Sequence, residues 1–267
     1  MTQYLLALLS LTVATSQPSS SGGDAAAPSA AIVPAGSPEL VGQLQRLRDE
    51  PIPDQGRGPL VIAYEKLIRA AGSDPVGPQA MMDLAQLFDT RDQTKHVEPD
   101  SASALRWYRR ASEAAGDMDP IWVKSRLQIV WHVEWASPRE AREILNEIAQ
   151  HPQADALDLA QVESSLINIS LRQGDLNEAE THARNLLGWY KTPSHQPIGD
   201  EKQTTDALID SAATTIVDAI APASLPLDAR IDRIKHLMDD YPTLQVLQDE
   251  GNDVLKDLAR ESQAQTN

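Results

Sequence analysis

Residues 174–187 read GDLNEAETHARNLL, and this stretch carries the pattern that decides the fold. A Gly-Asp turn opens it, a small residue follows at Ala179, and aliphatic residues come after it at intervals of three and four. Side chains at these intervals lie on one side of a helix. The stretch therefore predicts a turn followed by an amphipathic helix.

Four other stretches share this pattern, and together they indicate a repeat. They span residues 60–75, 102–117, 137–152 and 226–242. The small residues that lead the helices are separated by 41, 37, 38 and 50 positions, at Ala63, Ala104, Ala141, Ala179 and Ala229. The long interval contains TPSHQPIGD at 192–200, which is typical of an inserted loop.

A partner helix is expected before each of these segments, at 38–50, 79–90, 121–136, 154–172 and 203–221. One helical pair cannot bury its apolar side alone, so neighbouring pairs must stack and share a core. The sequence therefore predicts an all-α fold. We expect an α-solenoid of about five antiparallel helix pairs, and a further helix at 243–262 that caps its end.

Two stretches resemble known helical repeats. Residues 174–187 look like the turn and second helix of a tetratricopeptide repeat, and HVEPDSASALRWYRRASEAAGD at 96–117 is similar to the Sel-one-like repeat. Departures from both patterns occur at Gln128 and Ile167, where the families place a small residue. The resemblance implies a divergent member that binds another protein or a peptide on a concave surface.

By analogy with these families, the first helix of each pair lines a groove that suits an extended peptide. Amide side chains would pair with the peptide backbone, and shallow pockets would hold its side chains. A groove that only meets solvent is the alternative. The residues predicted to line the groove are Gln79, Met82, Gln86, Asp89, Trp122, Ser125, Ile129, His132, Gln161, Ser164, Asn168 and Arg172.

Composition excludes several classes of function. The 267 residues include 39 acidic and 23 basic ones, which gives a net charge of −16 and argues against non-specific binding to nucleic acid. Cysteine is absent, which excludes a disulfide framework, thiolate metal sites and a cysteine nucleophile. A protein or peptide is the expected partner, and no nucleic acid or stable membrane insertion is expected.

The two ends of the chain are expected to lie outside the repeat domain, which spans 38–262. Residues 1–16 contain the short apolar run YLLALLSLTVA followed by small residues, as in a secretory signal peptide. Export to a periplasmic or extracellular location follows from this interpretation. Residues 17–37 are rich in Ser, Ala, Gly and Pro and predict a disordered linker, and 263–267 predict a disordered tail.

Catalytic and cofactor motifs are missing from the sequence. The histidines have no spacing suitable for a metal, and neither a G-x-S-x-G nor a phosphate-binding glycine loop occurs. We therefore expect no catalytic residue, no cofactor and no metal. Trp131 and Trp135, four residues apart, are interpreted as core, because aromatic residues at helical spacing are usually buried.

These observations favour a non-catalytic scaffold or adaptor. Two alternatives remain open at this stage. One is an α/α-helical enzyme that acts on a polysaccharide with paired carboxylates, and the other is a structural subunit of an envelope assembly. The sequence does not decide the oligomeric state.

Overall fold

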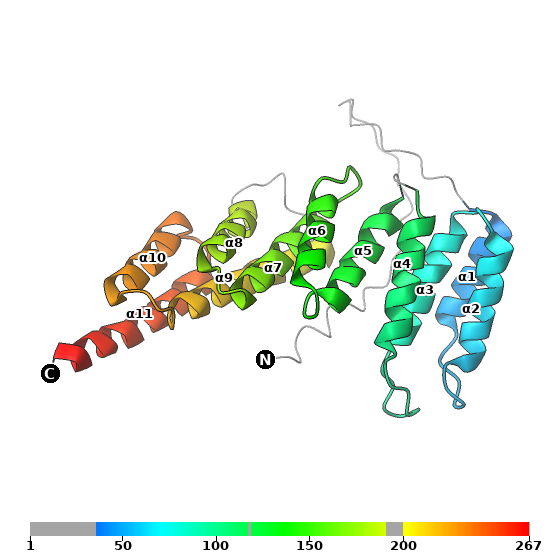
Figure 1. Cartoon of the computed structure of the whole chain (residues 1–267), viewed down its shortest axis with the longest axis horizontal. Helices are drawn as coiled ribbons and strands as arrows, with labels where there is room; N and C mark the ends of the chain where they lie inside the picture. The colour runs from blue at the N-terminus through cyan, green and yellow to red at the C-terminus, as the bar shows by residue number, and fades with distance from the viewer. Residues whose placement is uncertain (1–35, 117–118, 191–199, 267) are drawn as a thin grey trace. The chain divides into compact units, whose positions relative to one another are not determined.

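The computed structural model describes residues 36–116, 119–190 and 200–266, and it forms helices throughout (Figure 1). The described residues contain eleven helices and no strand beyond one isolated bridge between Asp92 and Val97. The helices are α1 (Pro38–Asp49), α2 (Gly58–Ala71), α3 (Val76–Asp89), α4 (Ser101–Ala114), α5 (Pro120–Val133), α6 (Pro138–Ala149), α7 (Ala156–Arg172), α8 (Leu176–Tyr190), α9 (Asp200–Ile220), α10 (Leu227–Asp240) and α11 (Gln245–Thr266).

The helices pack in chain order, as a solenoid requires. Each helix from α1 to α10 contacts the next one in the chain. Each odd-numbered helix also approaches the next odd-numbered helix, from α1 with α3 to α9 with α11, whereas the even-numbered helices approach each other less closely. The structure thus confirms an all-α fold of five helix pairs, with α11 as the additional helix, within the described residues.

Helix boundaries follow from residues visible in the sequence. The Asp100 carboxylate accepts a hydrogen bond from the backbone amide of Ser103 at 3.0 Å and caps α4. The Asp175 carboxylate accepts one from the Glu178 amide at 2.9 Å and caps α8. Gly174 adopts φ +77° just after α7, in the left-handed region that glycine tolerates best.

The recurring alanine has its expected role in three of the five pairs. Ala104, Ala141 and Ala179 are fully buried, which allows the neighbouring helices to approach closely. Ala63 and Ala229 are only half-buried. Repetition of this position is therefore strongest in the middle of the domain and weaker in the first and last pairs.

Long ionic side chains join the even-numbered helices where their backbones stand apart. Arg109 on α4 pairs with Glu140 on α6 at 2.9 Å. Arg142 on α6 pairs with Glu178 on α8 at 2.6 Å, and Arg184 on α8 pairs with Asp240 on α10. We call this series the arginine ladder. It joins second helices of successive pairs.

Most of the predicted N-terminal segments lie outside the described residues, and the prediction for the C-terminal tail is partly wrong. Residues 1–16 and most of the predicted linker lie outside the described residues, as do residues 192–199 of the inserted loop. Helix α11 continues through Thr266, so the disordered tail predicted at 263–267 is wrong for residues 263–266. The sequence QAQT contains no helix breaker, and nothing there ends the helix.

Candidate binding surface

Helix α3 presents part of the predicted groove to solvent. Gln86 is exposed and Gln79 is half-buried on the same side of the helix, as expected for residues seven apart. Met82 is only 7% exposed and packs in the core, so the prediction that it contacts a peptide is wrong. Asp89, at the end of α3, is half-buried and contacts His132.

Helix α5 turns most of its predicted groove residues toward the protein. Ser125 is fully buried and its hydroxyl donates to the Ile121 carbonyl at 2.7 Å. Ile129 is also buried. The ring of Trp122 stacks on that of His151, with 4.2 Å between the ring centroids. The guanidinium of Arg126 also lies over the Trp122 ring, 4.3 Å from its centroid. Ser125 and Ile129 therefore offer no surface to a ligand, and the prediction that they line the groove is wrong.

The solvent-facing stripe of α5 instead contains the two tryptophans that the sequence placed in the core. Lys124 and Trp131 are exposed, Gln128 is half-buried between them, and Trp135 continues the stripe in the turn after the helix. Trp131 is 44% exposed and Trp135 is 75% exposed. The interpretation of these tryptophans as core residues is wrong.

Helical geometry explains the misplaced tryptophan. Val123 is fully buried and Leu127 is 9% exposed, and Trp131 follows at the same interval of four. Each interval of four residues rotates the side chain by about 40° beyond a full turn, because one residue rotates it by about 100°. Trp131 therefore lies about 80° from Val123 around the helix and reaches solvent.

Helix α7 carries the third part of this surface. Asn168 is exposed, and Gln161, Ser164 and Arg172 are half-buried. We call the exposed and half-buried residues of α3, α5 and α7 on this side the tryptophan surface. It consists of Gln79, Gln86, Lys124, Gln128, Trp131, Trp135, Gln161, Ser164, Asn168 and Arg172. Apart from Lys124 and Arg172 it contains amide, hydroxyl and aromatic side chains.

An ionic contact holds Trp135 in place between α5 and α7. The guanidinium of Arg172 lies 4.1 Å from the ring centroid of Trp135, and its Nη1 pairs with the Glu134 carboxylate at 3.3 Å. Burial raises the pKa of Glu134, and the charge and hydrogen bond of Arg172 oppose that rise. One face of the Trp135 indole is therefore covered by Arg172, while three quarters of the side chain stays accessible.

A second polar contact joins α3, α4 and α5 beneath the same surface. His132 Nε2 lies 3.0 Å from an oxygen of Asp89, and the ring of Tyr108 lies 5.6 Å from that of His132. Burial raises the pKa of the Tyr108 hydroxyl, and the neighbouring Asp89 carboxylate adds to the rise. These groups hold each other, which makes His132 and Asp89 part of the packing rather than free ligand contacts.

Among residues 36–116, 119–190 and 200–266, no group of three or more His, Asp or Glu side chains could hold a metal ion. In the same part of the chain, no helix has the length and apolar character needed to cross a membrane. Comparisons with protein-family models, with curated proteins and with solved structures return no match.

Proposed function

We propose that this chain is a non-catalytic scaffold that binds a protein or an extended peptide across the tryptophan surface. The observation that carries the proposal is the exposure of Trp131 and Trp135 on the outward stripe of α5. Large exposed aromatic residues are costly to leave in water, and they are common energetic centres of protein interfaces. Trp135 is also held by Arg172, which limits the entropy lost when a partner packs on it.

The composition of the surrounding surface supports an extended polypeptide as the ligand. Gln86, Gln128 and Asn168 offer both amide donors and carbonyl acceptors, which can pair with a peptide backbone. The only charged residues of this surface are Lys124 and Arg172, although the chain has a net charge of −16. We further propose that the chain is a divergent tetratricopeptide or Sel-one-like repeat protein and that it is exported.

Exposed indoles also stack on sugar rings, which keeps the polysaccharide enzyme as a second candidate. Hydrolysis by paired carboxylates needs two acids that face the substrate. Two carboxylates of this region, Asp89 and Glu134, are engaged by His132 and Arg172. This engagement favours binding over hydrolysis.

The test is the capture of a specific partner by the full chain and the replacement of its aromatic anchors. The double variant Trp131→Ala and Trp135→Ala should lose the partner that the wild type retains, by at least tenfold in affinity. Substitution of Gln86 and Asn168 by Arg should weaken the same complex. The helical circular dichroism should stay unchanged, because these side chains are at the surface.

Val41→Ala provides the matched control, since Val41 is 47% exposed but lies on α1, outside the tryptophan surface. A partner retained equally by the wild type and the tryptophan double variant would contradict the proposal. So would binding of oligosaccharides, with no polypeptide partner, that depends on the same indoles.

A further inference from the structure

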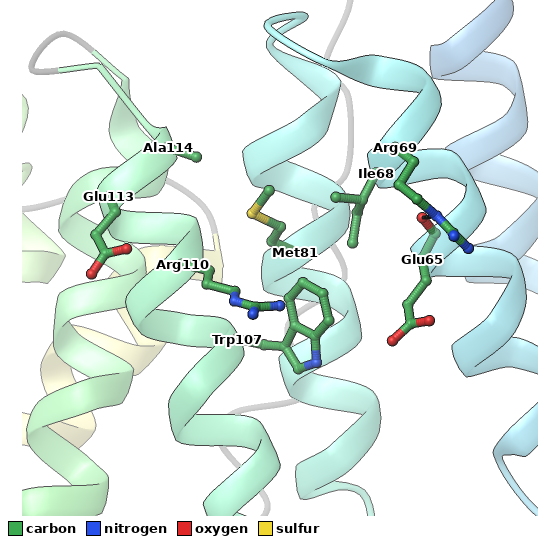
Figure 2. A pocket seen from close by; sticks show the side chains of 8 residues that line it. All are labelled: Glu65, Ile68, Arg69, Met81, Trp107, Arg110, Glu113 and Ala114. Atoms are coloured by element: carbon green, nitrogen blue, oxygen red, sulfur yellow. Dashed lines mark hydrogen bonds between the residues drawn. The ribbon is translucent and has the colours of Figure 1, made fainter.

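A separate pocket lies between α2 and α4, with α3 beneath it (Figure 2). It has a volume of about 590 Å³, within the usual range of ligand-binding pockets. Ile68, Met81 and Trp107 provide its apolar lining. Met81 is five residues before Gln86, so it lies about 140° away from that residue around α3. The pocket thus belongs to a different side of the helix from the tryptophan surface.

This pocket occupies the position where the arginine ladder is interrupted. Arginine–carboxylate pairs join α4 with α6, α6 with α8 and α8 with α10. Among the described residues, no ion pair joins α2 with α4. The two arginines at the pocket are engaged within their own helices: Arg69 Nε donates to the Glu65 carbonyl at 3.1 Å, and the Arg110 guanidinium lies 4.7 Å from the Trp107 ring centroid.

The two walls of the pocket carry the same pair of charges. Helix α2 contributes Glu65 and Arg69, and α4 contributes Arg110 and Glu113. In Figure 2, Glu65 and Arg69 lie on the α2 side of the pocket and Arg110 and Glu113 on the α4 side, with Met81 and Trp107 between them. Each wall of the pocket therefore carries one acid and one base.

The apolar part of this surface extends along α2. Ile62 lies on the same side of the helix as Arg69, two turns before it, and is 66% exposed. Together, Ile62 and the apolar lining of the pocket form an apolar strip that is longer than the pocket alone. Its length suits a helix that lies along the strip better than a single inserted side chain.

We infer that the pocket between α2 and α4 binds an amphipathic helix of a partner protein. The partner places an apolar ridge over Ile68, Met81 and Trp107, and its flanks carry charged residues of both signs. In this arrangement the partner's charges pair with Glu65 and Arg110, and so supply the ion pairs that α2 and α4 do not make with each other.

Charge complementarity selects this occupant. A purely acidic segment would face Glu65 and Glu113 as well as the net charge of −16. A purely basic segment would face Arg69 and Arg110 at close range. A helix with an apolar stripe and charges of both signs avoids both conflicts, and helix-in-groove binding is a common mode of recognition.

The experiment selects ligands from a displayed library of helical peptides that have a fixed leucine ridge and randomised flanking residues. The bait is the full chain, and a second selection uses the variant Glu65→Arg with Arg110→Glu, which keeps the net charge. Peptides selected on the wild type should bind this variant at least tenfold more weakly. Selection on the variant should return peptides in which the charges that face positions 65 and 110 are inverted.

The exchange Arg139→Glu with Glu143→Arg is the matched control. It swaps an exposed pair on α6, away from the pocket, and should leave binding unchanged. No enrichment of amphipathic peptides, or equal binding to the wild type and the pocket variant, would overturn the inference. So would self-association of the chain that the pocket variant abolishes, because the occupant would then be a second copy.

This inference and the proposed function can fail separately. Peptides that occupy the pocket should bind equally well to the double variant Trp131→Ala and Trp135→Ala. If that variant loses them while the pocket variant retains them, the peptides belong to the tryptophan surface and the pocket assignment is wrong. Retained circular dichroism and melting temperature in both variants exclude unfolding as the cause.

Discussion

Asp158 is almost completely buried at the first turn of α7, 4% exposed, where it forms a capping box with Asp155. The backbone amide of Asp158 donates to the Asp155 carboxylate at 2.8 Å, and the Asp155 amide donates back to Asp158 at 3.2 Å. Burial and the neighbouring Asp155 charge raise the pKa of Asp158 to about 6, although Lys124 opposes the rise. The folded chain therefore binds this proton more tightly than the unfolded chain does.

A raised carboxyl pKa means that stability is lost as the pH rises through the interval between the unfolded and folded values, from about 4 to about 6. Asp158→Asn removes the charge and keeps an acceptor for the cap. We expect the variant to exceed the wild type by roughly 1–3 kcal/mol at pH 7.5 and to match it near pH 4. Urea unfolding at both pH values is the measurement. A variant that is less stable at every pH would contradict the assigned pKa.

For single residues, exposure to solvent was harder to predict from the sequence than burial in the core. Ala80 and Leu84 are four residues apart on α3, so they lie near one stripe of the helix, and both are fully buried. Val123 and Leu127 begin a stripe of the same kind, yet Trp131 at its end is exposed. Spacing alone does not state where a helix stops being covered by its neighbours, and that depends on contacts between segments far apart in the chain.

One member of the arginine ladder, Arg142, has several partners, so its removal is costly. Arg142 on α6 pairs with Glu178 and also donates to Ser170 and to Gln173, at 3.1 and 2.8 Å. Hydrogen bonding by Arg142 lowers the pKa of Glu178. Arg142→Ala should destabilise the chain by about 2 kcal/mol, because Glu178 and Ser170 lose their shared partner. Urea unfolding curves provide the measurement.

Arg139→Ala, three residues earlier on the same helix, is the control for that prediction. Its side chain is 93% exposed and pairs only with Glu143 one turn away. Such pairs contribute less than about 0.5 kcal/mol. Equal effects of the two substitutions would show that the ladder contributes no more than ordinary surface charge.

Helices α10 and α11 approach each other closely at Gly251. A Cβ atom there would lie 2.6 Å from the sulfur of Met238 and 3.4 Å from a methyl carbon of Ile234. Gly251→Ala should therefore gain less than the usual helix-propensity increase of up to about 1 kcal/mol, since Met238 must move to make room. Gly42→Ala in α1 meets only ordinary contacts and should raise stability by up to about 1 kcal/mol. Thermal melting of both variants checks that Gly42→Ala stabilises the chain more.

Element positions were the most predictable part of the fold, because turn and capping residues mark them directly. Asp100, Asp175 and Gly174 lie at helix ends in the structure as their residue types suggest. The capping box of α7 follows the same chemistry, although Asp155 was not singled out from the sequence. The pocket between α2 and α4 could not be predicted, since it depends on how α2, α3 and α4 pack together and no motif marks it.

Across the described chain, the buried side chains form three clusters rather than one centre. Leu186 is fully buried in the cluster made by α7 to α11. Leu186→Ala should cost roughly 2–5 kcal/mol, and in a stacked array that loss should stay near the cavity. Hydrogen exchange measured by mass spectrometry should show lost protection in α8 to α11 and little change in α2 to α4.

Leu67→Ala tests the reverse case, since Leu67 is buried in the cluster made by α1 to α3 and Trp107 of α4 packs against it. Its loss of protection should appear at the opposite end of the helix order. Uniform loss in both variants would mean that the domain unfolds as one cooperative unit. The sequence predicted the repeat itself, because intervals of 37 to 41 residues recur, but it did not predict how far each repeat is coupled to the next.

The unequal spacing of the two sets of helices has a mechanical consequence. Odd-numbered helices meet through their backbones, whereas even-numbered ones are joined by solvated ion pairs. Parting one ladder ion pair costs about 2 kcal/mol at most, whereas parting the odd-numbered helices would expose apolar surface along their length. An applied load should therefore separate the even-numbered helices first, because less buried apolar surface holds that side together.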